Sequence, residues 1–229
     1  MDRDPQIDFS TVLASAVHDM KNSLCMLIQS IEHLGQNCAQ HDPEQATELA
    51  SLHYEASRLN TNLLQLLSLY RAEKHQLPLT IEENFVADLV EEMLAKNELY
   101  IEKKGLTIEL EVDDDLCWFF DLDLIGNLLN DIFINAMRYS KNLIKISAAI
   151  YNDQLEICIE DNGNGYPPEM LQLIDMPMQE LNLSTGRTGL GLFFARMIAS
   201  AHTNNKNTGR IELKNGGKYN GSVFKLILP

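Results

Sequence analysis

A histidine with a carboxylate beside it and an amide four positions later is one set of groups in this sequence that could do chemistry. The residues are His18, Asp19 and Asn22, and the apolar residues around them recur every three or four positions, as on one face of a helix. A neutral imidazole is a capable nucleophile near pH 7, so His18 could accept a transferred group. Taken alone, the pattern equally describes a partly exposed histidine on a packed helix.

A second set of polar residues lies in an otherwise apolar helical segment, "NLLNDIFINAMRYSK". Asp131 and Asn135 are four positions apart and therefore share a helix face, and Arg138 follows one turn later. Carboxylate and amide oxygens are suitable ligands for Mg²⁺, and a guanidinium group can bind phosphate oxygens. The simpler interpretation is a set of polar residues on the wet side of a helix.

The stretch "CIEDNGNGYP" places Asp161, Gly163 and Gly165 directly after a predicted strand. Asn-Gly and Asp-Asn sequences favour a tight hairpin turn, which is the simpler interpretation. The alternative is a ligand site, in which the glycines let the backbone approach a flat ligand. Asp161 would then accept a hydrogen bond from an exocyclic amine such as that of adenine.

The third cluster, "TGRTGLGLFFARMIASAH", contains Gly186, Gly189 and Gly191 immediately before an apolar helix. A helix N-terminus presents free N–H groups and a positive dipole end, which favour phosphate binding. A flexible loop capped by a helix is the competing interpretation. The three clusters together would supply the parts of a nucleotide site.

These groups must be positioned by two different kinds of structure. Apolar residues at helical spacing cover residues 9–34, and Asp42 and Pro43 form a good start for a second helix, whose seam runs through Leu49, Leu52, Ala56, Leu59, Leu63, Leu66 and Tyr70. Two such helices predict an antiparallel hairpin in residues 1–77. Two hairpins from two chains would complete a four-helix bundle, so we predict a homodimer.

The pattern changes at Pro78, and residues 78–229 read as a mixed α/β domain. Helices are expected at residues 86–103, 122–139 and about 190–201. Strands are expected at residues 106–112, 143–150, 154–160, 209–215 and 222–229. The predicted fold class is therefore α+β, with a helical hairpin followed by a separate domain.

Composition narrows the choice of partners. The net charge of −15 argues against an interface that neutralises nucleic-acid or membrane phosphates. The four cysteines have no paired spacing, which argues against a disulfide framework or zinc site and favours a reducing cytoplasm. No apolar run is long enough to span a bilayer, and the start lacks the features of a signal peptide.

In their order and spacing, the clusters resemble the motifs of bacterial two-component sensor histidine kinases. "DIFINAMRYS" resembles the N box of their ATP-binding domain, "DNGNG" the first glycine box and "GRTGLGL" the second, and the chain closes on a strand ending in "LP". The His18-Asp19 pair resembles the H box. The resemblance covers residues 8–229 and implies a GHKL-type α/β sandwich with helices on one face of a mixed sheet.

The resemblance implies ATP and Mg²⁺ as ligands. Asp161 would recognise adenine, Asn135 with Asp131 would hold Mg²⁺, and His18 would be phosphorylated, with Asp19 as its base and Asn22 positioning water for the reverse reaction. The remaining implied ATP-binding residues are Arg138, Tyr139, Gly163, Gly165, Gly189, Leu190, Gly191 and Ser222. Residues 167–188 would form the ATP lid, and a response-regulator receiver domain would be the phosphoryl acceptor.

The sequence departs from the family pattern at three places. Asp131 replaces the usual asparagine and adds negative charge near a triphosphate; the lid lacks a recognisable phenylalanine box; and Ser23 replaces a frequent proline, so a straighter first helix is expected. With so little chain before Phe9, we expect either that a separate protein supplies the signal or that the chain was truncated at its N-terminal side, and Met1 favours the first alternative.

Other functional classes fit parts of this sequence. A non-enzymatic histidine phosphotransfer protein would keep the bundle and lose nucleotide binding, as Asp131 and the altered lid allow. Gyrase-like, MutL-like and anti-sigma-factor ATPases share the ATP domain but lack a histidine-bearing bundle. His33, His41, His53, His75 and His202 lack the surroundings of His18 and are expected at the surface or in loops.

Overall fold

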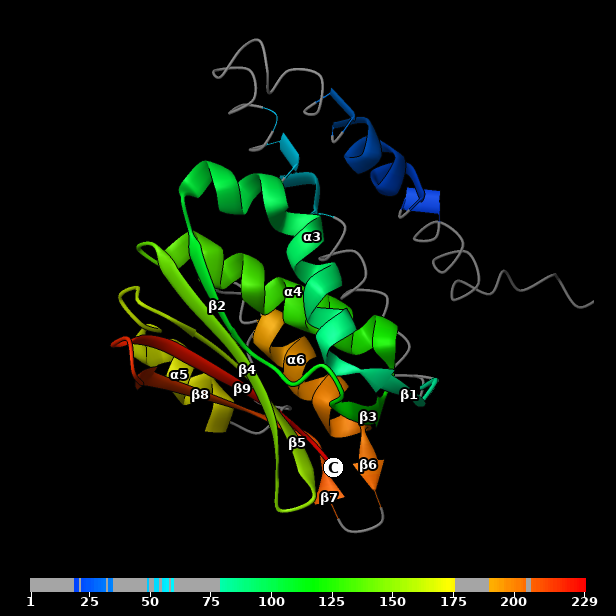
Figure 1. The fold of residues 1–229 in the computed structure, drawn as a ribbon, viewed down its shortest axis with the longest axis vertical. Helices are drawn as coiled ribbons and strands as arrows, with labels where there is room; N and C mark the ends of the chain where they lie inside the picture. Colours follow the sequence, from blue (N-terminus) through cyan, green and yellow to red (C-terminus); the bar gives the residue numbers. More distant parts are fainter. Residues whose placement is uncertain are drawn as a thin grey trace, which may run out of the picture. The chain divides into compact units, whose positions relative to one another are not determined.

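The chain consists of two compact units, Met1–Gln76 and Leu77–Pro229. The computed structural model describes residues 79–175, 190–204 and 207–229, together with residues 19–20, 22–31, 33–34, 49, 52–53, 55–57 and 59 of the first unit (Figure 1). The described residues of the first unit are all helical. His18 lies outside the described residues, as do the other residues of the predicted hairpin that these ranges do not include. None of the helices in the part of the chain that the structure describes has the length and hydropathy of a transmembrane segment.

The second unit is built on a five-stranded mixed sheet in the order β2-β4-β5-β9-β8. The strands are β2 (Thr107–Glu111), β4 (Leu143–Tyr151), β5 (Gln154–Asp161), β8 (Arg210–Gly216) and β9 (Gly221–Leu228). Only the β2–β4 pair in this sheet is parallel. The chain between these two strands contains a helix, as a parallel crossover requires.

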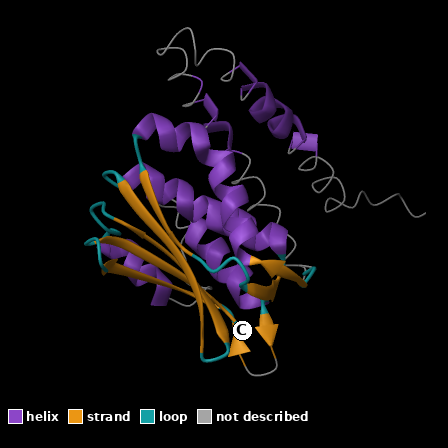
Figure 2. Ribbon diagram, in the orientation of Figure 1, coloured by secondary structure: helices purple, strands orange, loops and turns teal. Residues whose placement is uncertain are grey.

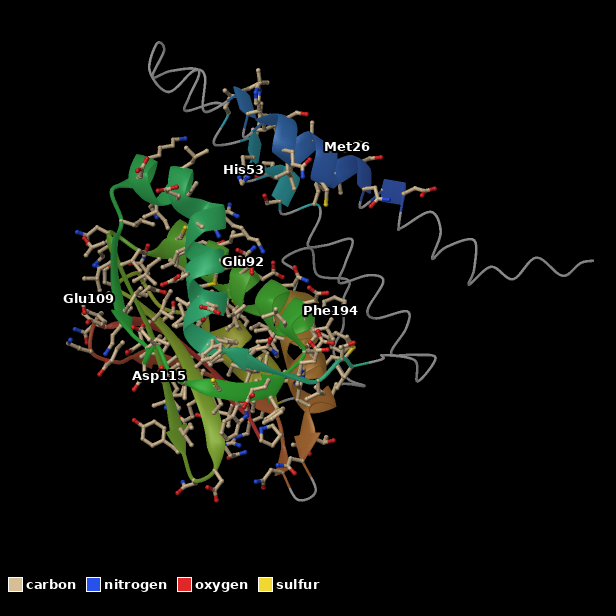
Figure 3. All side chains as sticks on the ribbon, turned by 45° about the vertical axis from the view of Figure 1, so that its right-hand side comes forward. Met26, His53, Glu92, Glu109, Asp115 and Phe194 are labelled. Carbon is tan, nitrogen blue, oxygen red and sulfur yellow. The ribbon has the colours of Figure 1, made fainter. Side chains whose placement is uncertain are left out.

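Three helices cover one face of this sheet: α3 (Val86–Lys104), α4 (Leu122–Tyr139) and α6 (Leu190–Ala201) (Figures 1 and 2). Alternate residues of β4, β5 and β9 point toward them, and these positions hold apolar side chains such as Ile146, Ile157 and Leu226, which have no exposed surface. Phe194 of α6, labelled in Figure 3, is also buried. The predicted sandwich, with helices on one face of a mixed sheet, is confirmed for this unit.

The structure also contains two strand pairs and one helix that were not predicted from the sequence. Strands β1 (Glu82–Phe85) and β3 (Cys117–Phe120) pair antiparallel, as do β6 (Thr203–Asn204) and β7 (Asn207–Thr208), and α5 (Pro168–Asp175) follows β5. The indole N–H of Trp118 on β3 donates to the carbonyl of Pro229 at 3.2 Å, which ties the chain end to this ribbon. Trp118 is the single tryptophan of the sequence, so its fluorescence reports the unfolding of this unit alone.

His202, expected at the surface or in a loop, follows the last residue of α6, outside any helix or strand, but its side chain is buried. Its side chain is 3% exposed at the end of α6. Nδ1–H donates to the carbonyl of Ile198 at 2.8 Å, and Nε2 accepts from the backbone N–H of Asp121 at 3.1 Å. This arrangement requires a neutral imidazole, and burial lowers the pKa of His202.

The stability of this unit should therefore fall in mild acid. Unfolded histidine titrates near pH 6.5, so stabilisation by neutral His202 is complete above about that pH. It is lost as the pH falls from there toward the lowered pKa of the folded state. The midpoint of thermal unfolding, read by Trp118 fluorescence, should decrease by roughly 2–4 °C between pH 7.5 and 5.5. A His202→Gln chain should unfold at a lower temperature, and its unfolding midpoint should no longer show the decrease that is due to His202. If the midpoint of this variant changes with pH as it does in the wild-type chain, His202 is not the group responsible.

Candidate nucleotide site

The centre of the candidate site is Asp161, the last residue of β5, which is 3% exposed. Its Oδ1 atom accepts hydrogen bonds from the backbone N–H groups of Gly163, at 2.6 Å, and Ser222, at 3.2 Å. Within the described part of the chain, Oδ2 receives no hydrogen bond. A buried carboxylate oxygen without a donor is costly, so this atom is suited to accept a hydrogen bond from a bound ligand.

The segment after Asp161 is not a hairpin turn. It leads into α5, and β5 pairs with β4 and with β9, which is far along the chain. Gly163 lies so close to the end of α4 that a Cβ atom on it would be 2.4 Å from the carbonyl oxygen of Tyr139. No side chain fits there, and the backbone at Gly163 packs directly on the end of this helix.

Helix α4 carries the predicted metal and phosphate ligands. It begins at an N-cap, Asp121, whose side chain accepts from Leu124 N–H at 2.9 Å, and its apolar side is buried. On the other side Asp131 is half-buried, and Asn135 and Arg138 are exposed. The Asp131 and Asn135 side chains are one helical turn apart, which allows their oxygens to share a cation.

Two asparagines that were not predicted hold the loop after β5 in place. The side-chain carbonyl of Asn162 accepts from the backbone N–H groups of residues 141, 142 and 143 at 3.0–3.2 Å, which joins the loop to the end of α4. The side-chain amide of Asn215 on β8 accepts from Tyr166 N–H at 2.6 Å and donates to Tyr166 O at 2.8 Å. Gly165, with φ of 80°, lies against the Asn215 side chain.

Tyr166 is a further residue of the site that sequence reasoning missed. Burial raises the pKa of its hydroxyl, and the negative charge of Asp161 raises it further. A tyrosine hydroxyl is protonated at neutral pH even without such a shift, so the raised pKa indicates mainly that the Tyr166 hydroxyl is removed from water and near the charge of Asp161.

The other predicted site residues are described in part. Ser222 on β9 is buried, and its N–H binds Asp161. Gly191 lies in the first turn of α6, which begins at Leu190. Gly186 and Gly189, with the larger part of the predicted lid, lie outside the described residues. In the first unit Asp19 and Asn22 are helical and exposed, and the Ser23 hydroxyl donates to Asp19 O at 2.9 Å.

Residues 120–229 match the family described as histidine kinase-, DNA gyrase B- and HSP90-like ATPases. Over 224 residues the chain is 27% identical to the sensor protein SrrB of Staphylococcus aureus, which covers 95% of this chain and 37% of SrrB. The chain thus spans 37% of the length of this curated relative.

Among solved structures, the catalytic domain of histidine kinase ThkA matches with a TM-score of 0.55 and 25% identity, over 66% of this chain and 95% of that domain. The histidine kinase AdeS of Acinetobacter baumannii matches with a TM-score of 0.60 and 23% identity, over 87% of this chain and 95% of AdeS. At this identity, the match with AdeS shows a similar fold and nothing further.

Proposed function

Because this chain is a relative of the two-component sensor histidine kinases and carries their GHKL-type ATP-binding domain, we propose that it is an ATP-dependent histidine kinase. It would phosphorylate His18 and transfer the phosphoryl group to an aspartate of a response-regulator receiver domain. The observation that carries the proposal is the buried Asp161, whose Oδ1 accepts from two backbone N–H groups and whose Oδ2 receives no hydrogen bond from the described residues.

Each part of the ATP molecule has a candidate partner in this chain. Asp161 Oδ2 accepts from the exocyclic amine of adenine, with the Gly163 backbone beside the ring. Asp131 and Asn135 would hold Mg²⁺, which offsets charge on the phosphates when bound. Arg138 and the N-terminus of α6 would bind phosphate oxygens. The residues that complete the pocket are Tyr139, Gly165, Gly189, Leu190, Gly191 and Ser222.

The proposed chemistry is an in-line transfer of the γ-phosphoryl group from ATP to His18. A ring nitrogen of His18 attacks the γ-phosphorus, the bond from that phosphorus to the β,γ-bridging oxygen breaks, and ADP leaves. Asp19 takes the proton released by the imidazole. The phosphoryl group then passes to a carboxylate oxygen of the regulator, and the His18 N–P bond breaks.

A homodimer is the proposed assembly. Apolar residues at seam positions of the predicted hairpin remain about half exposed in the single chain, with 50% for Leu27, 51% for Leu34, 56% for Leu52 and 54% for Leu59. A second hairpin would bury these side chains, as in four-helix bundles. A separate sensor protein and a cytoplasmic location remain predictions.

The proposal is tested by incubating the purified chain with γ-labelled ATP. We expect a label that is stable in alkali and lost in acid, as for a phosphorus–nitrogen bond. Asn135→Ala should reduce the rate of labelling at least about hundredfold by removing a proposed Mg²⁺ ligand; Asn127→Ala, an exposed asparagine on the same helix, is the matched control. If the wild-type chain neither binds Mg²⁺-ATP nor becomes labelled, a non-enzymatic phosphotransfer protein becomes the better assignment.

Asn22 is proposed to position water for dephosphorylation of the regulator. Its amide is exposed on the first helix, three positions after Asp19. We expect Asn22→Ala to slow dephosphorylation of a phosphorylated receiver domain about tenfold while changing autophosphorylation less than twofold. Both rates are measured with the same labelled regulator, and an equal loss of both would contradict the role in positioning water.

A further inference from the structure

Lys104, the last residue of α3, binds the end of a different helix. Its ammonium group donates to the backbone carbonyls of Met137, Arg138, at 3.1 Å, and Ser140, at 2.9 Å. Met137 and Arg138 belong to the last turn of α4, where carbonyl groups lack partners within the helix. A cation at this position also interacts favourably with the negative end of the helix dipole.

These three carbonyls surround the point at which α4 meets the loop after β5. The carbonyl of Tyr139 lies against Gly163, and Asn162 binds the backbone N–H groups of residues 141–143. Lys104 therefore holds the chain on both sides of Tyr139, and the loop that carries Asp161 and Gly163 packs on this segment. Movement of the end of α4 would displace this loop.

The charge of Lys104 also matters to this site. The side chain is half-buried, and burial lowers its pKa, while the negative charge of Asp161 acts in the opposite direction. The ammonium group of Lys104 therefore lies close enough to the candidate adenine-binding carboxylate for the two charges to interact.

We propose that Lys104 is a positioning residue for nucleotide binding, which holds the end of α4 against the Asp161–Gly163 loop without contacting the nucleotide. The inference rests on the proposed function, because it assumes that the nucleotide binds at Asp161. Nothing in the spacing of the sequence motifs points to Lys104, which is one of two consecutive lysines before a glycine.

The test is calorimetric titration of the full chain with Mg²⁺-ADP, at a temperature at which Trp118 fluorescence shows each variant to be folded. Lys104→Met should raise the dissociation constant at least about tenfold, and Lys104→Arg, which keeps charge and donors, should return it to within about threefold of the wild-type value. Lys96→Met is the matched control, because Lys96 lies on the same helix in an exposed ion pair with Glu92, and it should bind as the wild-type chain does.

Should Lys104→Met fail to fold, Lys104→Gln replaces it in the same comparison, with the same expected direction. Wild-type affinity in a folded Lys104→Met or Lys104→Gln chain would overturn the inference and leave the proposed function intact. The same holds if Lys104→Arg binds as weakly as Lys104→Met. Failure of the wild-type chain to bind Mg²⁺-ADP would instead overturn both.

Discussion

Replacement of Asp161 by asparagine is expected to weaken the binding of ATP by about a hundredfold. Asparagine keeps a carbonyl oxygen for the N–H groups of Gly163 and Ser222, so the loop after β5 should stay in place. Its NH₂ group would replace Oδ2 and face the exocyclic amine of adenine, donor against donor. An unpaired buried polar group costs about 1–3 kcal/mol, and the upper part of that range corresponds to the expected change.

Inosine triphosphate makes this prediction specific. It carries a carbonyl oxygen in place of the exocyclic amine, so the wild-type chain should prefer ATP, and Asp161→Asn should lose or reverse that preference. Equilibrium titration of both nucleotides measures it. Asp153→Asn, at an exposed position in the β4–β5 turn, is the control and should bind as the wild-type chain does. Unchanged affinities in Asp161→Asn would show that adenine is not read by this carboxylate.

Replacement of His18 by glutamine is expected to abolish phosphorylation while leaving ATP affinity within about twofold of the wild-type value. The proposed acceptor and the proposed nucleotide site belong to different compact units, so loss of the imidazole removes the nucleophile and no part of the pocket. The two measurements are incorporation of label from γ-labelled ATP and titration with Mg²⁺-ADP. His18→Gln should lose only the first, whereas Asp161→Asn should lose both.

The control for His18 is His33→Gln, which removes an exposed histidine from the same predicted helix. That variant should be labelled at the wild-type rate. Undiminished labelling of the His18→Gln chain would place the acceptor on another residue, and the H-box assignment would be wrong. Loss of nucleotide affinity in His18→Gln would point to a folding defect in place of a chemical one.

Local patterns predicted most helices and strands of the ATP-binding unit. The apolar spacing of residues 122–139 predicted α4 with the observed bounds, because burial of one side and a polar residue at the start are both properties of neighbouring residues. The alternation in residues 154–160 likewise predicted β5 to within one residue. The pairing of β1 with β3, which are far apart along the chain, was not predicted. Each strand has only four residues, and their sequences, EENF and CWFF, show no clear alternation of polar and apolar residues.

His202 shows where a local pattern misleads. A polar residue at the end of an apolar helix reads as exposed, since nothing near it in sequence supplies a partner. In the folded unit its imidazole is satisfied by Ile198 and by Asp121, 81 positions away. Burial of a polar group depends on such partners, and their distance along the chain conceals them.

Residue types and spacing are enough to predict which residues could bind a nucleotide: a carboxylate after a strand, amide and carboxylate oxygens on one helix face, and glycines before another helix. The hairpin turn after Asp161 could be excluded only from the fold, because the segment leads into α5 and β9 supplies Ser222 N–H to the carboxylate from 61 positions away. The fold also shows that Asn162 and Asn215 hold the loop after β5, and that Lys104 binds the end of α4. Their side chains bind backbone groups of other elements, and such bonds follow from how the elements pack, which spacing along the chain does not encode.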